Sequence, residues 1–299
     1  MELGIDLGGT AVKLGVADGG DLVASTTIPV TGTPSDLEDA AAHASALLGD
    51  VAATSVGIAV PGIVSQDGRR LLQANDKYGY LNGVDLVSWS RDTLGAPAVV
   101  ENDARAALVG EIHGGCADGV RDAVAVILGT GIGTAAVVGG VPVRGAHGHA
   151  GVLGGHVTVD IDAPLCPCGN IGCAESLAST RALREQFPML HGFDELLAGA
   201  RESDLLRDAV DRHLAIWGAT VVSMCHAYDP DVVVLSGGIL RAGDAVRDPI
   251  TAYVDEHLWS SAHRPRVRVP DHPELSVLRG LTVLAAQASR SGTEQKETR

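Results

Sequence analysis

One stretch of the chain places four zinc-binding side chains close together. Residues 155–175 read GHVTVDIDAPLCPCGNIGCAE and hold one histidine with three of the chain's five cysteines. One imidazole and three thiolates complete a tetrahedral zinc site with no position open for water, so such a site is structural. A disulfide is the alternative, but disulfides suit secreted chains and no secretory segment is visible. We therefore predict a closed zinc site formed by His156, Cys166, Cys168 and Cys173.

The composition is that of a globular protein with an acidic balance. Hydrophobic residues are 45% and charged residues 20% of 299, enough material for one large domain or two smaller ones. The net charge of −15 makes nucleic acid a poor partner. The N-terminal sequence lacks the pattern of a signal peptide, and no apolar run reaches the roughly 20 residues that span a bilayer. We expect a cytoplasmic protein with no membrane partner.

Two glycine-rich loops repeat one design, in which a loop joins two strands. DLGGT interrupts the alternating strand pattern of residues 2–28, and GTGIG lies between predicted strands at 123–128 and 134–138. Glycines expose backbone N–H groups to phosphate, and a carboxylate at a strand end can hold Mg²⁺. One such loop alone usually means only a turn, but two copies favour a duplicated phosphate-binding scaffold. The predicted contacts are Asp6, Gly8, Gly9, Thr10, Gly129, Thr130, Gly131 and Gly133.

A third feature is an Asn-Asp pair between a short strand and a helix. The strand Ala98–Glu101 delivers Asn102 and Asp103 at its carboxyl end, where open α/β sheets bind their ligands. Such a pair is most often a helix N-cap. Its position after a strand and downstream of a phosphate loop favours a functional role.

Four helices follow from caps and periodicity. Thr33-Pro34 opens a helix to about Leu48, and Ala104 begins one that ends near His113. A helix runs from Glu175 to about Gln186. Ser203 caps a long helix with an apolar stripe that ends before Asp229-Pro230.

The chain resembles the ROK family, a group of bacterial sugar kinases and sugar-responsive repressors. The resemblance rests on Gly-His, nine residues, then Cys-x-Cys-Gly-x-x-Gly-Cys-x-Glu, and on Glu-Asn-Asp-Ala, and it extends over nearly the whole chain. The glycine loops resemble the phosphate loops of the actin/hexokinase superfamily. The strand Val232–Leu235, followed by Ser236, Gly237 and Gly238, resembles its adenosine motif.

The resemblance implies an α/β fold with two actin-like (ribonuclease H-like) domains, a ligand cleft between them and a zinc-binding loop. The expected N-terminal domain is 1–116, with a C-terminal helix at about 275–290 that packs back on it. The expected C-terminal domain is 117–274, with the zinc loop at 156–173. Gly114–Asp118 is the candidate hinge.

The implied activity is ATP-dependent phosphorylation of glucose or a related hexose at O6, by a homodimer or higher homo-oligomer. ATP and Mg²⁺ serve catalysis, and Zn²⁺ is structural. Asp103 is the implied general base. Asn82 remains an alternative to Asn75 as a sugar contact. The implied sugar contacts are Pro61, Gly62, Asn75, Asn102, Asp103, His156 and Glu175.

Two alternatives remain, a ROK-type regulator and a sugar-binding pseudokinase. ROK repressors carry a helix-turn-helix segment ahead of the first phosphate strand, which here begins at Glu2, so we expect a kinase. The intact phosphate loops and Asp103 favour catalysis over a pseudokinase.

One position departs from the family pattern. Glucokinase-like members carry a glutamate three residues before the zinc histidine, where it binds sugar hydroxyls near C1 and C2, whereas this chain has Leu153. Leucine accepts no hydrogen bond, and apolar walls discriminate weakly between sugars. We expect looser selection at C1 and C2, unless His147 or His149 replaces the contact.

Overall fold

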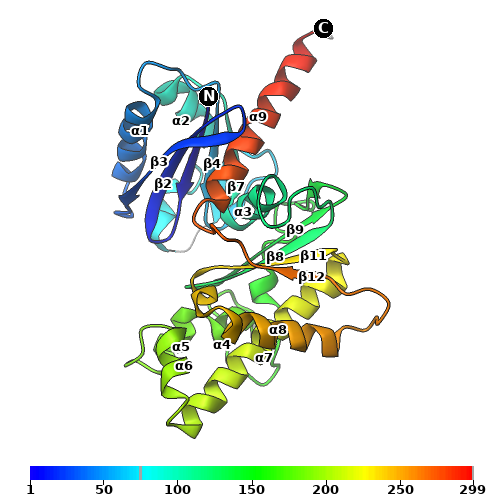
Figure 1. Ribbon diagram of the computed structural model, residues 1–299. Coiled ribbons are helices and arrows are strands. Elements are labelled where there is room, and N and C mark those ends of the chain that lie inside the picture. The colour runs from blue at the N-terminus through cyan, green and yellow to red at the C-terminus, as the bar shows by residue number, and fades with distance from the viewer. Residues whose placement is uncertain (74–75, 298–299) are drawn as a thin grey trace. The chain divides into compact units, whose positions relative to one another are not determined.

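The computed structural model describes residues 1–73 and 76–297, and the chain forms two compact units (Figure 1). Asn75, a predicted sugar contact, lies outside the described residues. The chain passes from one unit to the other four times. The first unit comprises Met1–Gly119, Arg144–Ala150 and His272–Arg299, and the second comprises Val120–Val143 and Gly151–Asp271.

The first unit is built on a five-stranded sheet in the order β3-β2-β1-β4-β7. β1 and β2 are antiparallel, as are β2 and β3, whereas β4 and β7 continue the sheet in parallel. Because side chains alternate along a strand, Leu3, Ile5 and Leu7 all lie on one face, in a core shared with two helices. The elements are β1 (Glu2–Leu7), β2 (Ala11–Asp18), β3 (Asp21–Pro29), β4 (Ser55–Val60), β7 (Ala98–Asn102), α1 (Ser35–Leu48) and α2 (Leu86–Leu94).

The other face of this sheet is covered by α9 (Ser276–Glu297), which lies beside α3 (Asp103–Ile112) (Figure 1). Glycines make the close approach possible. A Cβ on Gly57 of β4 would lie 2.4 Å from the Leu281 carbonyl oxygen, and one on Gly280 of α9 would lie 1.8 Å from the Ala106 carbonyl oxygen. Backbone therefore packs against backbone where α9 crosses the sheet and α3, the helix that begins at Asp103.

Gly280→Ala should destabilise the protein by about 1–3 kcal/mol, because overpacking outweighs the roughly 1 kcal/mol that alanine gains in a helix. The thermal unfolding midpoint measures the effect. Gly79→Ala is the matched control, since a Cβ there meets no atom within 4 Å. Equal midpoints for Gly280→Ala and wild type would contradict the close-packing account.

The second unit repeats the topology of the first. Its sheet order is β10-β9-β8-β11-β12, with two antiparallel pairs followed by two parallel ones. The sequence predicted this duplication from the glycine loops. The strands are β8 (Ala123–Leu128), β9 (Ile132–Val138), β10 (Val141–Pro142), β11 (Val232–Ser236) and β12 (Arg266–Arg268).

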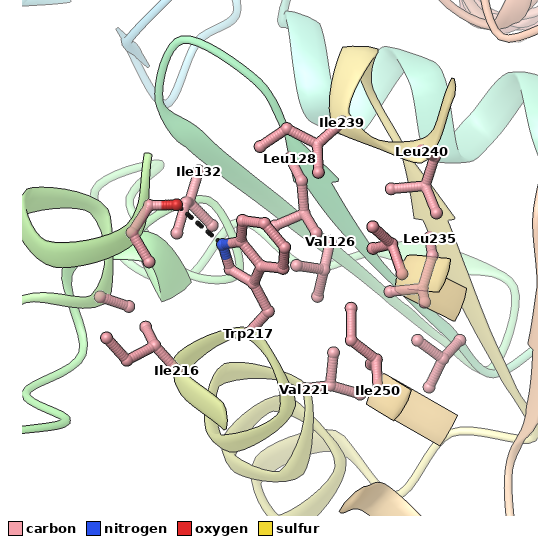
Figure 2. Close-up of a cluster of buried hydrophobic side chains, with 14 of the residues drawn as sticks. Val126, Leu128, Ile132, Ile216, Trp217, Val221, Leu235, Ile239, Leu240 and Ile250 are labelled. Atoms are coloured by element: carbon pink, nitrogen blue, oxygen red, sulfur yellow. Dashed lines mark hydrogen bonds between the residues drawn. The ribbon is translucent and has the colours of Figure 1, made fainter. Parts of the chain in front are cut away.

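The core of the second unit centres on Trp217 of α7 (Asp204–Tyr228), whose indole is fully buried against the sheet (Figure 2). Trp217 Nε1 donates to the carbonyl oxygen of Ala178 at 2.8 Å. That carbonyl ends α4 (Ala174–Ala178), and Ser179 caps α5 (Thr180–Gln186) by accepting a hydrogen bond from Ala182 N at 3.1 Å. The predicted continuous helix from Glu175 to Gln186 is therefore wrong.

Other predicted elements agree with the structure within a few residues. The predicted cap at Ser203 is present, because its Oγ accepts a hydrogen bond from Leu206 N. The C-terminal helix α9 ends at Glu297 and is therefore longer than the expected 275–290. Within residues 1–73 and 76–297, no helix combines the length and apolar composition of a membrane span. The remaining elements are β5 (Ile63–Val64), β6 (Leu71–Gln73), η1 (Asp76–Leu81), η2 (Gly154–His156), α6 (Phe193–Gly199), η3 (Gly238–Ala242) and α8 (Asp244–His257).

Candidate functional site

Asp6 lies next to the first glycine loop, near the end of β1, and is only 4% exposed. Its Oδ1 has no hydrogen-bond partner within the described part of the chain. Burial, together with the negative charge of Asp103, raises the pKa of Asp6 to about 7. A buried carboxylate oxygen without a partner, close to a second carboxylate, fits a divalent cation. Asp6 would hold Mg²⁺ there, directly or through water.

Asp103 is held in one orientation by its neighbours. Its Oδ1 accepts hydrogen bonds from Ala104 N at 2.8 Å and from Asn102 Nδ2 at 3.1 Å. These bonds occupy Oδ1 and leave Oδ2 as the oxygen that can take a proton. Burial raises the pKa of Asp103 above its usual range, which makes the carboxylate a stronger base.

Asn102 takes the capping role that such a pair usually has, and its site role stays a prediction. Its Oδ1 caps α3 by accepting from Arg105 N at 3.1 Å, and its Nδ2 donates to the Gly62 carbonyl at 3.0 Å as well as to Asp103. Both N–H bonds of the side-chain amide are thus used. A sugar hydroxyl could still donate to the remaining lone pair of Oδ1.

An ion-pair network is formed by Glu101 and Arg105, the residues that flank the segment Asn102–Ala104 in the sequence. Glu101 and Arg105, each 1% exposed, are joined at 2.6 Å, and Arg144 binds the second carboxylate oxygen of Glu101. Arg105 Nη2 also donates to the carbonyls of Gly148 and Ala150, at 3.1 and 3.0 Å. Arg105 therefore holds the segment 144–150 against the junction of β7 and α3. Sequence patterns gave no signal for this role, because Glu101 lies in β7 and only Arg105 lies in α3, so the helical four-residue pairing rule does not apply.

The second glycine loop is held by Glu175. Its Oε2 accepts from Ile132 N at 2.9 Å, and its Oε1 pairs with Arg181 at 3.0 Å. A Cβ on Gly131 would lie 2.5 Å from Glu175 Oε2, so a larger residue there would have to displace the Glu175 carboxylate. The helix break at Ser179 brings Thr180 N to within 3.0 Å of the Gly129 carbonyl. The carboxylate predicted to bind sugar thus also supports the loop.

One predicted nucleotide contact, Gly133, lies outside its expected loop, whereas Gly237 lies in the turn after β11 as predicted. Gly133 was expected in the loop, but it lies in β9 and pairs with Ile127, because the strand begins at Ile132. Gly237 adopts φ 100°, and a Cβ there would lie 2.2 Å from the Leu128 carbonyl oxygen, so the adenosine-like turn packs on the end of β8.

The four predicted zinc ligands converge. Their ligand atoms all lie within 4.8 Å of one another, with Cys168 Sγ 3.6 Å from Cys173 Sγ and Cys166 Sγ 3.8 Å from His156 Nδ1. A Zn–S bond of about 2.3 Å implies a tetrahedral edge of roughly 3.8 Å. The 3.6 Å sulfur separation fits that edge and is far too long for a disulfide of about 2 Å. The donor set and its spacing therefore fit zinc.

Cys168→Ser should lower both zinc content and stability, because the metal loses one of its thiolates. Elemental analysis of wild type purified without chelators should give one zinc per chain, and the variant should unfold at lower temperature and lose sugar binding. Cys116→Ser, which changes a cysteine outside the cluster, is the control. Wild type without zinc would refute the assignment.

The structure places the other residues that were predicted or considered as sugar contacts as follows. Pro61 and Gly62 follow β4, and Asn82 is exposed at the end of η1. Leu153, 39% exposed, precedes η2 and accepts from His156 N through its carbonyl at 2.9 Å. His147 and His149 are exposed, with ring centroids 6.4 Å apart, in the segment held by Arg105.

A family model described as "ROK family" matches residues 2–288. The chain belongs to the ROK family. It is 32% identical over 298 residues to a glucokinase of Streptomyces coelicolor, covering 89% of this chain and 90% of that one. It is 26% identical over 209 residues to the xylose repressor of Bacillus subtilis, covering 69% of this chain but only 53% of the repressor.

Solved structures agree with this membership. A ROK hexokinase from Thermus thermophilus superposes with a TM-score of 0.81 at 28% identity, covering 97% and 99% of the two chains. A ROK-family glucokinase from Streptomyces griseus, in complex with glucose and AMPPNP, gives 0.79 at 28% identity, covering 96% and 99%. The predictions of a ROK-family sugar kinase and of its α/β, actin-like fold are confirmed.

Proposed function

We propose that this protein transfers the γ-phosphoryl group of ATP to the primary hydroxyl, O6, of glucose or a related hexose. The observation that carries the proposal is the geometry of Asp103, a partly buried carboxylate with one oxygen fixed and the other available to a proton. The Streptomyces griseus relative with bound glucose and AMPPNP supports both substrate classes. Such chemistry belongs in the cytoplasm, where ATP is supplied.

The proposed mechanism follows from what phosphoryl transfer requires. Asp103 Oδ2 accepts the proton of the sugar hydroxyl as the oxygen attacks the γ-phosphorus, and the bond to the β–γ bridging oxygen breaks to release ADP. The hydrogen bonds from Asn102 and Ala104 to Asp103 Oδ1 hold the carboxylate in this orientation. Mg²⁺, when bound near Asp6, would neutralise phosphate charge, and backbone N–H groups of the glycine loops would bind phosphate oxygens.

Asp103→Asn should reduce kcat by roughly 10²–10⁴, the usual cost of losing a general base. The amide oxygen can keep both hydrogen bonds that Oδ1 now accepts, so fold and sugar affinity should persist. Steady-state kinetics with calorimetric sugar binding measure both quantities. A near-wild-type kcat in the purified variant would show that Asp103 is not the base.

The competing function is sugar binding without catalysis, as in a regulator, and the repressor relative keeps this alternative open. A coupled ADP-release assay over hexoses and N-acetylhexosamines, repeated with polyphosphate as donor, decides between them. Turnover with at least one sugar establishes a kinase. Binding of a sugar without turnover with either donor would establish a binding protein.

We further propose that Leu153 relaxes selection at C1 and C2. Mannose and 2-deoxyglucose should compete well with glucose, because an apolar wall rejects neither. The ratio of kcat/KM values among the three sugars tests this. Leu153→Glu, which restores an acceptor at a half-exposed position, should raise the preference for glucose. A wild-type preference for glucose of several hundredfold would overturn the idea.

A further inference from the structure

The second glycine loop has hydrogen-bond donors to offer, while its acceptors are already in use. All three carbonyl oxygens of its Gly-Thr-Gly turn accept a hydrogen bond, from Thr180 N at 3.0 Å, Arg181 N at 3.3 Å and Gly129 N at 3.0 Å. The N–H groups of Thr130 and Gly131 have no partner among the residues that the structure describes. Thr130 is exposed, and a Cβ built on Gly129 meets no atom within 4 Å. The loop therefore offers donors and space to a ligand, as an anion requires.

A negative charge lies beside these donors. Glu175 Oε2 accepts from Ile132 N at 2.9 Å, and it would lie 2.5 Å from a Cβ on Gly131. The side chain of Glu175 is only 12% exposed, so water screens its charge poorly. Like charges a few ångströms apart repel each other. A carboxylate in this place therefore opposes the binding of phosphate to the loop unless a cation neutralises it.

Arg181 supplies that cation. Its Nη2 lies 3.0 Å from Glu175 Oε1, and its backbone N donates to the Thr130 carbonyl oxygen. One residue thus contacts both the loop and the carboxylate beside it. All of these contacts lie within the second unit.

We propose that Arg181 is a positioning residue for nucleotide phosphate, which neutralises Glu175 so that the second glycine loop can bind an anion. The inference rests on the proposed kinase function. Arg181 acts through Glu175 and not on the transferred group. Without the guanidinium, Glu175 could keep its hydrogen bond from Ile132 N, but its charge next to the loop would be uncompensated.

The test compares Arg181→Met with Arg181→Lys, which keeps the charge, and with Arg184→Met as the control. Arg184 lies three residues later in α5 and donates to the His191 carbonyl at 2.7 Å, not to Glu175. Arg181→Met should raise the calorimetric Kd for ATP and ADP by roughly three- to thirtyfold, the effect of one unit charge a few ångströms away with partial screening by water. Adenosine carries no phosphate, so its affinity should stay close to wild type. Arg181→Lys and Arg184→Met should bind ATP nearly as wild type does.

A double variant distinguishes charge from shape. Glu175→Gln removes the negative charge, while its amide oxygen can still accept from Ile132 N. Added to Arg181→Met, it should restore most of the lost ATP affinity, because no uncompensated charge then remains beside the loop. This readout measures nucleotide binding alone, so the predicted contact of Glu175 with the sugar does not affect it.

The outcomes separate this inference from the proposed function. If wild type turns over a hexose and Arg181→Met matches it in ATP affinity, the role of Arg181 is wrong and the kinase stands. Equal losses in Arg181→Met and Arg181→Lys, an equal loss of adenosine affinity, or no recovery in the double variant would mean a merely structural arginine and also overturn the inference. Wild type without nucleotide binding would overturn both.

Discussion

The main constraint on this structure is the free-energy cost of desolvating two carboxylates, Asp6 and Asp103, at the carboxyl ends of strands in one sheet. Asp6 and Asp103 each lose solvation, and the charge of Asp103 adds to the penalty at Asp6. Desolvated like charges are unfavourable unless a cation or hydrogen-bond donors compensate. For Asp103 the donors are Asn102 and Ala104, which the strand–helix junction supplies. Among the described residues Asp6 Oδ1 has no hydrogen-bond partner, so the burial of this carboxylate is destabilising at a position where a cation can bind.

The candidate zinc loop is joined through the backbone to the second glycine loop. Cys173 is two residues from Glu175, which accepts from Ile132 N in the second glycine loop. Burial, with the hydrogen bond that the Cys173 thiol donates to Cys168 Sγ, raises the pKa of Cys173 to about 12, so without a cation the thiol stays protonated. A bound cation would displace that proton and fix the start of α4. The candidate metal site and the glycine loop of this unit thus share one short segment.

Local patterns predicted much of this structure, and long-range contacts explain where they failed. Alternation and glycine turns gave both strand–turn–strand units, and ligand type and spacing gave the zinc cluster. The break at Ser179 escaped prediction because the Ala178 carbonyl is satisfied by Trp217, 39 residues away. The contacts of Arg105 with Gly148 and of Tyr78 with Gly8 span 43 and 70 residues, and no local pattern encodes them. Periodicity shows that a residue is buried but not which backbone group it meets.

The placement of α9 has a consequence for how the protein is made. Residues 1–119 emerge from the ribosome first, yet the helix that covers one face of their sheet is encoded at the other end of the chain. Roughly 150 residues separate the two, which at about 5–20 residues per second is a delay on the order of ten seconds or more. During that interval the sheet lacks the helix residues Leu278 and Leu281, which lie against Gly4, Gly15 and Gly57 in the folded protein. The second unit, encoded almost without interruption, can complete its core first, so the half of the protein synthesised first is the half that finishes folding last.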